Sequence, residues 1–141
     1  MTVAQIAVDA LVNAPRKRVW FYWTQPDEIK QWNFANDDWR CPSVECDLTV
    51  GGSYKARMEA KDGSFGFDFA AVFEDIQPHE SVAMMMDDNR KTRTTFVEMG
   101  NGTQVTTVFD AEISNPIEMQ RDGWQAILNN FKRHVETSER T

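Results

Sequence analysis

The last stretch of the chain, residues 115–138, constrains the fold most, because its pattern predicts one long amphipathic helix. Asn115 and Pro116 suit the cap and the first helical position, and Glu118 stands where a capping box needs it. A helix of this length runs to roughly 35 Å at 1.5 Å per residue, so it needs a broad apolar surface to lie on. Its apolar stripe, at offsets of three, four, seven and eleven residues, comprises Trp124, Ile127, Leu128, Phe131 and Val135.

Gly123 stands inside this predicted helix, next to Trp124. An interior helix glycine costs roughly 1 kcal/mol relative to alanine, so it usually answers a local need. That need is either close approach of the helix backbone to a strand or room beside Trp124 for a bound molecule. The sequence leaves both explanations open.

The composition fits one soluble globular domain over residues 1–141. A chain of this length removes about two-thirds of its unfolded surface from water. The net charge of −7 disfavours a nucleic-acid partner. No apolar run approaches the roughly 18 residues of a membrane span, and the N-terminus lacks the pattern of a secretory signal. We therefore expect a cytoplasmic protein.

The sequence offers no metal-binding or cofactor-binding motif. Cys41 and Cys46 match neither a zinc knuckle nor a Cys-x-x-Cys redox pair, so free thiols are expected. His79 lies in a predicted turn and His134 in the last turns of the predicted long helix, far apart in the chain. We predict no metal site and no cofactor.

The first third of the chain predicts one strand, two short helices and a loop. Residues 3–12 alternate apolar and polar positions, which is typical of a strand with one buried face. Helical spacing follows at about 15–23, and Pro26 opens a second short helix. From residue 33 to 44 the periodicity disappears, which indicates a loop that carries Phe34 and Trp39.

The middle of the chain predicts antiparallel strands joined by tight turns. Glycine-containing turn signals occur at 51–52, 62–63 and 100–102, and each separates segments of strand-like alternation. The expected fold class is α+β, with a curved antiparallel sheet of about six strands in the order β-α-α-β-β-β-β-β-α. Such a sheet has one face to bury, and the long C-terminal helix is the element large enough to cover it.

Several short motifs, in this order and spacing, resemble the START-like (SRPBCC) superfamily. Within that superfamily the chain is similar to the group of the C-terminal domain of the activator of heat-shock protein 90 ATPase. The resemblance covers essentially the whole chain. It rests on Asn13-Ala14-Pro15 with Val19-Trp20 and Trp23-Thr24, Pro26 with Ile29 and Trp32-Asn33, Asp47-Leu48 with Val50-Gly51-Gly52, Ile76 with Pro78 and Glu80, and Gly123-Trp124 with Leu128.

This resemblance implies a helix-grip fold with a cavity between the sheet and the long helix. Across the superfamily that cavity takes lipids, sterols, polyketides and other apolar molecules. Members include carriers, sensors, cyclases and co-chaperone domains, so the function must be argued from the site. The additional N-terminal domain that the heat-shock protein activators possess has no counterpart in this sequence.

The first hypothesis is a non-catalytic carrier or sensor that binds a small apolar or aromatic molecule between helix and sheet. Methionine side chains adapt to irregular apolar gaps, although methionine more often simply fills a core. Phe34 and Trp39 are expected at the mouth, unless they plug the edge of the core. The predicted ligand-binding residues are Phe34, Trp39, Met58, Phe67, Phe69, Met84, Met86, Trp124, Leu128 and Phe131.

The second hypothesis is an enzyme, such as a cyclase or hydrolase, that acts on a bound apolar substrate. Its acid or base would be Asp68, Glu59, Asp37 or Asp38. A carboxyl group flanked by phenylalanines has a raised pKa if it turns inward. Strand alternation places Asp68 on the outer face if its neighbours face inward, and no catalytic residues can be assigned.

The third hypothesis is a protein-interaction domain, for example for a chaperone, that uses the acidic surface. Acidic charge of this kind is usually a solvated exterior. An electrostatic partner would bind more weakly as salt rises. Ligand identity and oligomeric state are not encoded in any recognisable motif.

Overall fold

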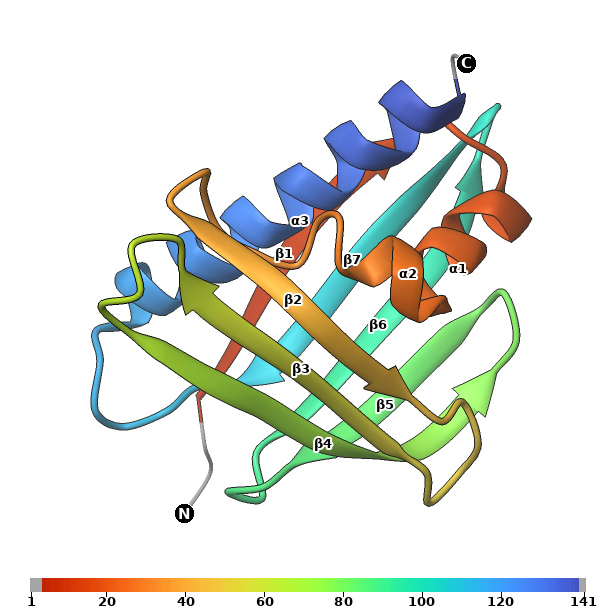
Figure 1. Cartoon of the computed structure of the whole chain (residues 1–141). Coiled ribbons are helices and arrows are strands. Elements are labelled where there is room, and N and C mark those ends of the chain that lie inside the picture. Colours follow the sequence, from red (N-terminus) through yellow and green to blue (C-terminus); the bar gives the residue numbers. More distant parts are fainter. Residues whose placement is uncertain (1–3, 140–141) are drawn as a thin grey trace.

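The computed structural model describes residues 4–139, which form a seven-stranded antiparallel sheet and three helices (Figure 1). The elements, in chain order, are β1 (Gln5–Val12), α1 (Arg16–Thr24), α2 (Pro26–Ile29), β2 (Trp39–Cys46), β3 (Ser53–Ala60), β4 (Gly66–Gln77), β5 (Ser81–Met86), β6 (Lys91–Met99), β7 (Gly102–Asp110) and α3 (Ile117–Glu139).

The strand order is β1-β7-β6-β5-β4-β3-β2, and all neighbouring strands are antiparallel. Every pair joins strands that are consecutive in the chain, except the pair of β1 with β7. Figure 1 shows the sheet curling from β1 round to β2, with α3 on its inner side and alongside β1. The predicted α+β helix-grip fold is confirmed. A curved sheet gripping one helix leaves its two edges, β1 and β2, far apart in the strand order.

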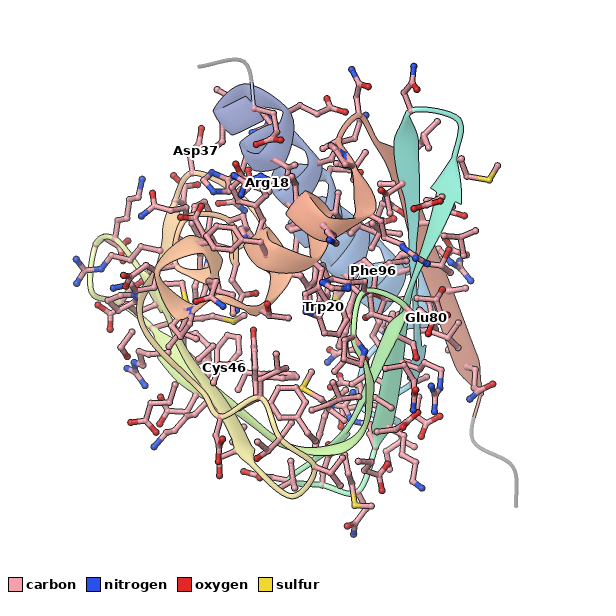
Figure 2. All side chains as sticks on the ribbon, turned by 90° about the vertical axis from the view of Figure 1, so that its right-hand side faces the viewer. Arg18, Trp20, Asp37, Cys46, Glu80 and Phe96 are labelled. Atoms are coloured by element: carbon pink, nitrogen blue, oxygen red, sulfur yellow. The ribbon has the colours of Figure 1, made fainter. Side chains whose placement is uncertain are left out.

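The core is formed by strands whose residues alternate between exposed and buried positions. In β1 every second residue is buried, and β7 repeats this pattern, so their inner faces turn towards α3. Phe96, Phe109 and Phe131 are fully buried between the sheet and the helices. Trp20 of α1 lies next to Phe96 of β6, with ring centroids 5.3 Å apart (Figure 2). These aromatic side chains hold α1, α3 and the sheet together.

The sheet has one strand more than the sequence predicted. Residues 39–46, most of which were expected to be loop, form β2 and pair with β3. The register shifts between Arg40 and Ser43, which interrupts the alternation from which a strand is recognised. Pro42 is tolerated there because β2 is an edge strand. The prediction of about six strands is therefore corrected to seven.

The expected capping of the long helix is also wrong. The Asn115 amide donates to the Glu112 carboxylate, and Glu118 pairs with Arg121 at 3.1 Å instead of closing a capping box. Gln120 holds the turn before the helix: its amide nitrogen donates to the Asn115 carbonyl at 2.8 Å and its oxygen accepts from the Glu112 N–H at 2.9 Å. One buried side chain replaces the predicted cap.

Side-chain hydrogen bonds fix α3 against its neighbours. The Gln125 amide donates to the Asp9 carbonyl at 2.9 Å, which ties the helix to β1. Further along, the Asn130 amide donates to the Trp32 carbonyl at 3.1 Å, which ties it to the segment after α2. None of the helices within residues 4–139 is both long and apolar enough to cross a bilayer.

Candidate ligand-binding cavity

A cavity of about 180 Å³ lies between the first half of α3 and the curved sheet. Its walls come from α1, the segment after α2, six strands and α3. The lining residues are Val8, Trp23, Trp32, Asn33, Tyr54, Met58, Phe67, Phe69, Met84, Thr92, Thr94, Thr107, Trp124, Ile127 and Leu128. No charged side chain is among these residues, so the site is apolar with a few neutral polar groups.

Stacked aromatic rings give the cavity rigid walls. Trp124 of α3 stacks on Phe109 of β7 with ring centroids 3.9 Å apart and planes 11° from parallel. The same indole meets Phe69 of β4 edge-on at 6.4 Å. Trp23 and Trp32 stack at 5.0 Å on another wall. Such contacts limit ring motion and suit the site to a flat or apolar guest.

The neutral polar groups of the lining come mainly from β3 on one side and from β6 and β7 on the other. Thr94 of β6 and Thr107 of β7 share a hydrogen bond of 2.8 Å. Tyr54 of β3, Thr92 of β6 and Asn33 also line the cavity. Burial raises the pKa of Tyr54 well above its ordinary value, so its hydroxyl stays neutral and keeps its proton.

The structure brings together most of the residues that the sequence singled out. Met58 from β3, Met84 from β5 and two phenylalanines from β4 face Trp124 and Leu128 of α3 across the cavity. The two phenylalanines are Phe67 and Phe69, and Phe67 is also partly open to solvent. Their role in ligand binding stays a prediction, but their common location is now a structural fact.

Four of the predicted residues lie elsewhere. Phe131 is 0% exposed and packs edge-on against Trp23 and Trp32, with 4.9 Å between ring centroids in each pair, so it belongs to the core. Met86 is buried at the end of β5 and does not reach the cavity. Phe34 is half-buried away from the lining. These three residues were expected in the cavity lining and are not part of it.

The fourth, Trp39, begins β2 at the rim of the cavity. Its ring lies 6.0 Å from that of Phe67, which does line the cavity, and 5.9 Å from that of exposed Phe65. Trp39 therefore contacts the mouth of the cavity through Phe67 without lining the interior. The predicted mouth residue Trp39 thus lies next to a lining residue and is not itself part of the lining.

Nine of the residues that line the cavity were not predicted from the sequence. Thr92, Thr94 and Thr107 alternate with buried Phe96 and Phe109 on their strands, so strand alternation alone indicates that they face inward. Tyr54 alternates with Met58 in the same way. The other residues that line the cavity without having been predicted are Val8, Trp23, Trp32, Asn33 and Ile127.

The carboxyl groups considered for catalysis lie outside the cavity lining. Asp68 is exposed and pairs with Arg57 at 3.6 Å. The hydrogen bond from Arg40 at 2.9 Å holds the pKa of Glu59 below its ordinary value. Asp37 and Asp38 are exposed. None of these groups has the buried environment that raises a carboxyl pKa for proton transfer.

Both cysteine thiols are free, with no disulfide between them. Burial raises the pKa of Cys41 and of Cys46 to about 11, which keeps them protonated. Within residues 4–139, no three His, Cys, Asp or Glu side chains gather as a metal site would require.

Comparison with known proteins gives the family context. Residues 13–136 match the model of the family described as Activator of Hsp90 ATPase homolog 1-like protein. The solved AHSA1-like protein from Aeromonas hydrophila is 40% identical, with 96% of this chain and 94% of that chain covered and a TM-score of 0.91. No curated protein matches the sequence.

Two further solved structures extend the likeness. A protein from Cytophaga hutchinsonii is 38% identical over 96% of this chain and 94% of its own, with a TM-score of 0.82. A protein from Chromobacterium violaceum is 24% identical over 94% of this chain and 96% of its own, with a TM-score of 0.83. The last likeness speaks for the fold alone.

Proposed function

The chain belongs to the family of Activator of Hsp90 ATPase homolog 1-like proteins, and we propose that it binds a small apolar or aromatic molecule as a non-catalytic carrier or sensor. One observation carries this proposal: a cavity of about 180 Å³ with an uncharged, largely aromatic lining between α3 and the sheet. Concave, mostly apolar sites with few polar groups are where small molecules bind.

The cost of the cavity supports a ligand. Protein interiors pack as densely as organic crystals, and an unfilled volume forfeits contacts between its walls. If it were left empty, a cavity of about 180 Å³ would lower stability by about 4 kcal/mol, at about 24 cal/mol per Å³. A domain of this size is stable by only about 5–15 kcal/mol. A molecule that fills the space restores these contacts.

The expected affinity follows from the buried area. A single aromatic ring that enters the cavity buries about 200 Å² of apolar surface. At about 25 cal/mol per Å² this contributes about 5 kcal/mol, which corresponds to a Kd of about 0.2 mM. Affinity in this range calls for a titration by NMR or by tryptophan fluorescence.

The test is a panel of small apolar and aromatic compounds titrated against the wild-type protein and two variants. Ile127→Trp places a large ring in the cavity lining and should weaken binding at least tenfold. Met119→Trp makes the same kind of change on the same helix at a residue that is 60% exposed, and should bind as the wild type does. Absence of binding by every compound, or equal binding by all three proteins, would reject the proposal.

A carrier or sensor fits the lining better than an enzyme. Acid–base catalysis needs a titratable group within hydrogen-bond reach of the substrate, and the cavity lining offers neither a carboxylate nor an imidazole. The raised pKa values of Cys41 and Cys46 leave no activated thiol close by. Unchanged recovery of a bound compound after prolonged incubation is the matching observation.

A partnership with a chaperone is the second candidate, favoured by the description of the family. It would place the protein in the cytoplasm, where we expect it. The acidic net charge of −7 suits an electrostatic contact that weakens as salt rises. Co-purification with Hsp90 at low but not at high salt supports this candidate, and failure to co-purify at either ionic strength rejects it.

A further inference from the structure

Thr92 differs from the other buried threonines in its hydrogen bonding. Thr24 and Thr103 each donate to a backbone carbonyl, at 2.8 and 2.9 Å, and Thr94 and Thr107 bond to each other. Thr92 is 5% exposed and lines the cavity, and its side-chain hydroxyl has no hydrogen-bond partner among residues 4–139. Among the buried threonines of the described chain, Thr92 is therefore the one whose hydroxyl is free to hydrogen-bond to a ligand.

The Thr92 hydroxyl is also reachable. No side-chain nitrogen or oxygen within residues 4–139 is both fully buried and without a partner. Because Thr92 is buried as a residue and unbonded, its oxygen must be open to a small molecule, and the cavity is the space that it lines. An unpaired hydroxyl in such a place costs free energy unless water or a ligand bonds to it.

Tyr54 offers a second open hydroxyl from another part of the sheet. It lines the cavity from β3, and its ring packs edge-on against Phe69 at 6.0 Å. No residue in the described part of the chain hydrogen-bonds to this hydroxyl. Tyr54 and Thr92 thus present two neutral donors, which also accept, from β3 and β6.

The lining decides against charged ligands. It contains no lysine, arginine, aspartate or glutamate that could pair with a carboxylate or an ammonium group. Burial of an unpaired charge is far more costly than burial of a hydroxyl. A molecule that enters with its polar end first must therefore be neutral at that end.

The volume limits the size of the buried part. An apolar cavity of about 150 Å³ admits benzene, and this cavity measures about 180 Å³. One ring with a few substituent atoms fills it. A fused ring system such as a sterol exceeds it, unless most of the molecule stays outside.

We infer that the natural ligand of this cavity is a neutral, single-ring-sized molecule that carries a hydroxyl or carbonyl oxygen, and that Thr92 and Tyr54 bind this oxygen. The inference rests on the proposed binding function and narrows it to one chemical class. A hydrocarbon of the same shape displaces water from both hydroxyls without replacing its hydrogen bonds, so it binds more weakly.

The experiment titrates four compounds that share a methyl-substituted ring: p-cresol, toluene, 4-methylbenzoate and 4-methylbenzylamine. The indole N–H signals of Trp23, Trp32 and Trp124 report from the cavity, that of Trp39 reports from its rim, and that of Trp20 reports from outside it. We expect p-cresol to bind about tenfold more tightly than toluene. The two charged compounds should bind at least tenfold more weakly than toluene.

Variants assign the preference to the two hydroxyls. Thr92→Val and Tyr54→Phe remove one hydroxyl each with little change of shape. Each should narrow the gap in affinity between p-cresol and toluene, because p-cresol loses a hydrogen bond and toluene no longer displaces water from that hydroxyl. Thr92→Ser keeps the hydroxyl and should keep the gap. Thr95→Val is the matched control, because Thr95 follows on the same strand and does not line the cavity.

The outcomes distinguish a failure of the inferred ligand class from a failure of the proposed binding function. If toluene binds as tightly as p-cresol, if the charged compounds bind as well as the neutral ones, or if neither hydroxyl variant changes the preference, the inference is overturned and the binding function stands. If no compound shifts any indole signal, the binding function itself fails. Thermal unfolding of each variant confirms that a loss of preference occurs in a folded protein.

Discussion

Replacement of Gly123 by alanine should stabilise the protein by about 1 kcal/mol. Gly123 lies inside α3, and a Cβ built there meets no other atom within 4 Å. Close approach of the helix backbone to a strand therefore does not explain this glycine. The substitution gains helix propensity, because the unfolded chain loses freedom that glycine gives it. For a chain of this size the expected rise in Tm is about 3 °C.

Gly63→Ala is the matched control for this prediction. Its Cβ also meets nothing within 4 Å, but its φ of +78° lies in the left-handed region. Alanine there should destabilise the protein by about 1 kcal/mol. Urea denaturation of the two variants and the wild type measures both changes. If Gly123→Ala lowers the denaturation midpoint, or if both variants shift it in the same direction, the reasoning from backbone conformation is refuted.

The same variant also tests the remaining explanation for Gly123, which is room for a ligand beside Trp124. If a bound molecule needs that space, Gly123→Ala should raise the stability of the free protein and weaken binding of p-cresol severalfold. If affinity for p-cresol is unchanged, the glycine has no role in binding. The comparison needs no further control, because the free and bound states belong to one variant.

Further predictions concern the core, the thiols and the carboxyl groups. Phe131→Ala should lower the free energy of unfolding measured by urea denaturation by about 3–5 kcal/mol, clearly more than Phe34→Ala, and equal losses would contradict the full burial of Phe131. Burial raises the pKa of Cys41 and Cys46 from 9.0 to about 11, so the unfolded chain loses these protons first. Stability should therefore fall between about pH 9 and 11, and less steeply in a variant with both cysteines replaced by alanine; an identical slope would argue against buried thiols. Asp68→Asn should leave ligand affinity within twofold, and a larger loss would mean that this carboxylate reaches the ligand.

The sequence was most informative where one periodicity ran unbroken. The alternation of residues 3–12 and the helical stripe of residues 115–138 became β1 (Gln5–Val12) and α3 (Ile117–Glu139), so the predicted ends lie within two residues of the observed ones. The strand at Trp39 was missed because the register shift after Arg40 breaks the alternation. The cap at Asn115 was wrong because the side chain of Gln120, in the first turn of the helix, satisfies the turn instead. The capping rules consider the residues up to the third helical position and therefore do not include this contact.

The site was harder to predict than the fold, for a geometric reason. Trp124, Leu128 and Phe131 share one stripe of α3, and the sequence treats them alike. In the structure Trp124 and Leu128 line the cavity, whereas Phe131 is enclosed by Trp23 and Trp32. Which part of a stripe meets a packed surface depends on the curvature of the sheet, and curvature arises from bulges and register shifts that the sequence pattern does not show.

The unequal packing along α3 connects stability to function. Its later part is held by buried Phe131 and Val135 and by the hydrogen bond from Lys132 to the Leu11 carbonyl at 2.6 Å. Its earlier part leaves Trp124 and Ile127 only half-buried over the cavity. The earlier part also packs on the sheet, where Trp124 stacks on Phe109 and Gln125 donates to the Asp9 carbonyl. The same turns form a wall of the cavity, so under the proposed function a ring-sized ligand would add its contacts to a part of the helix that is already anchored.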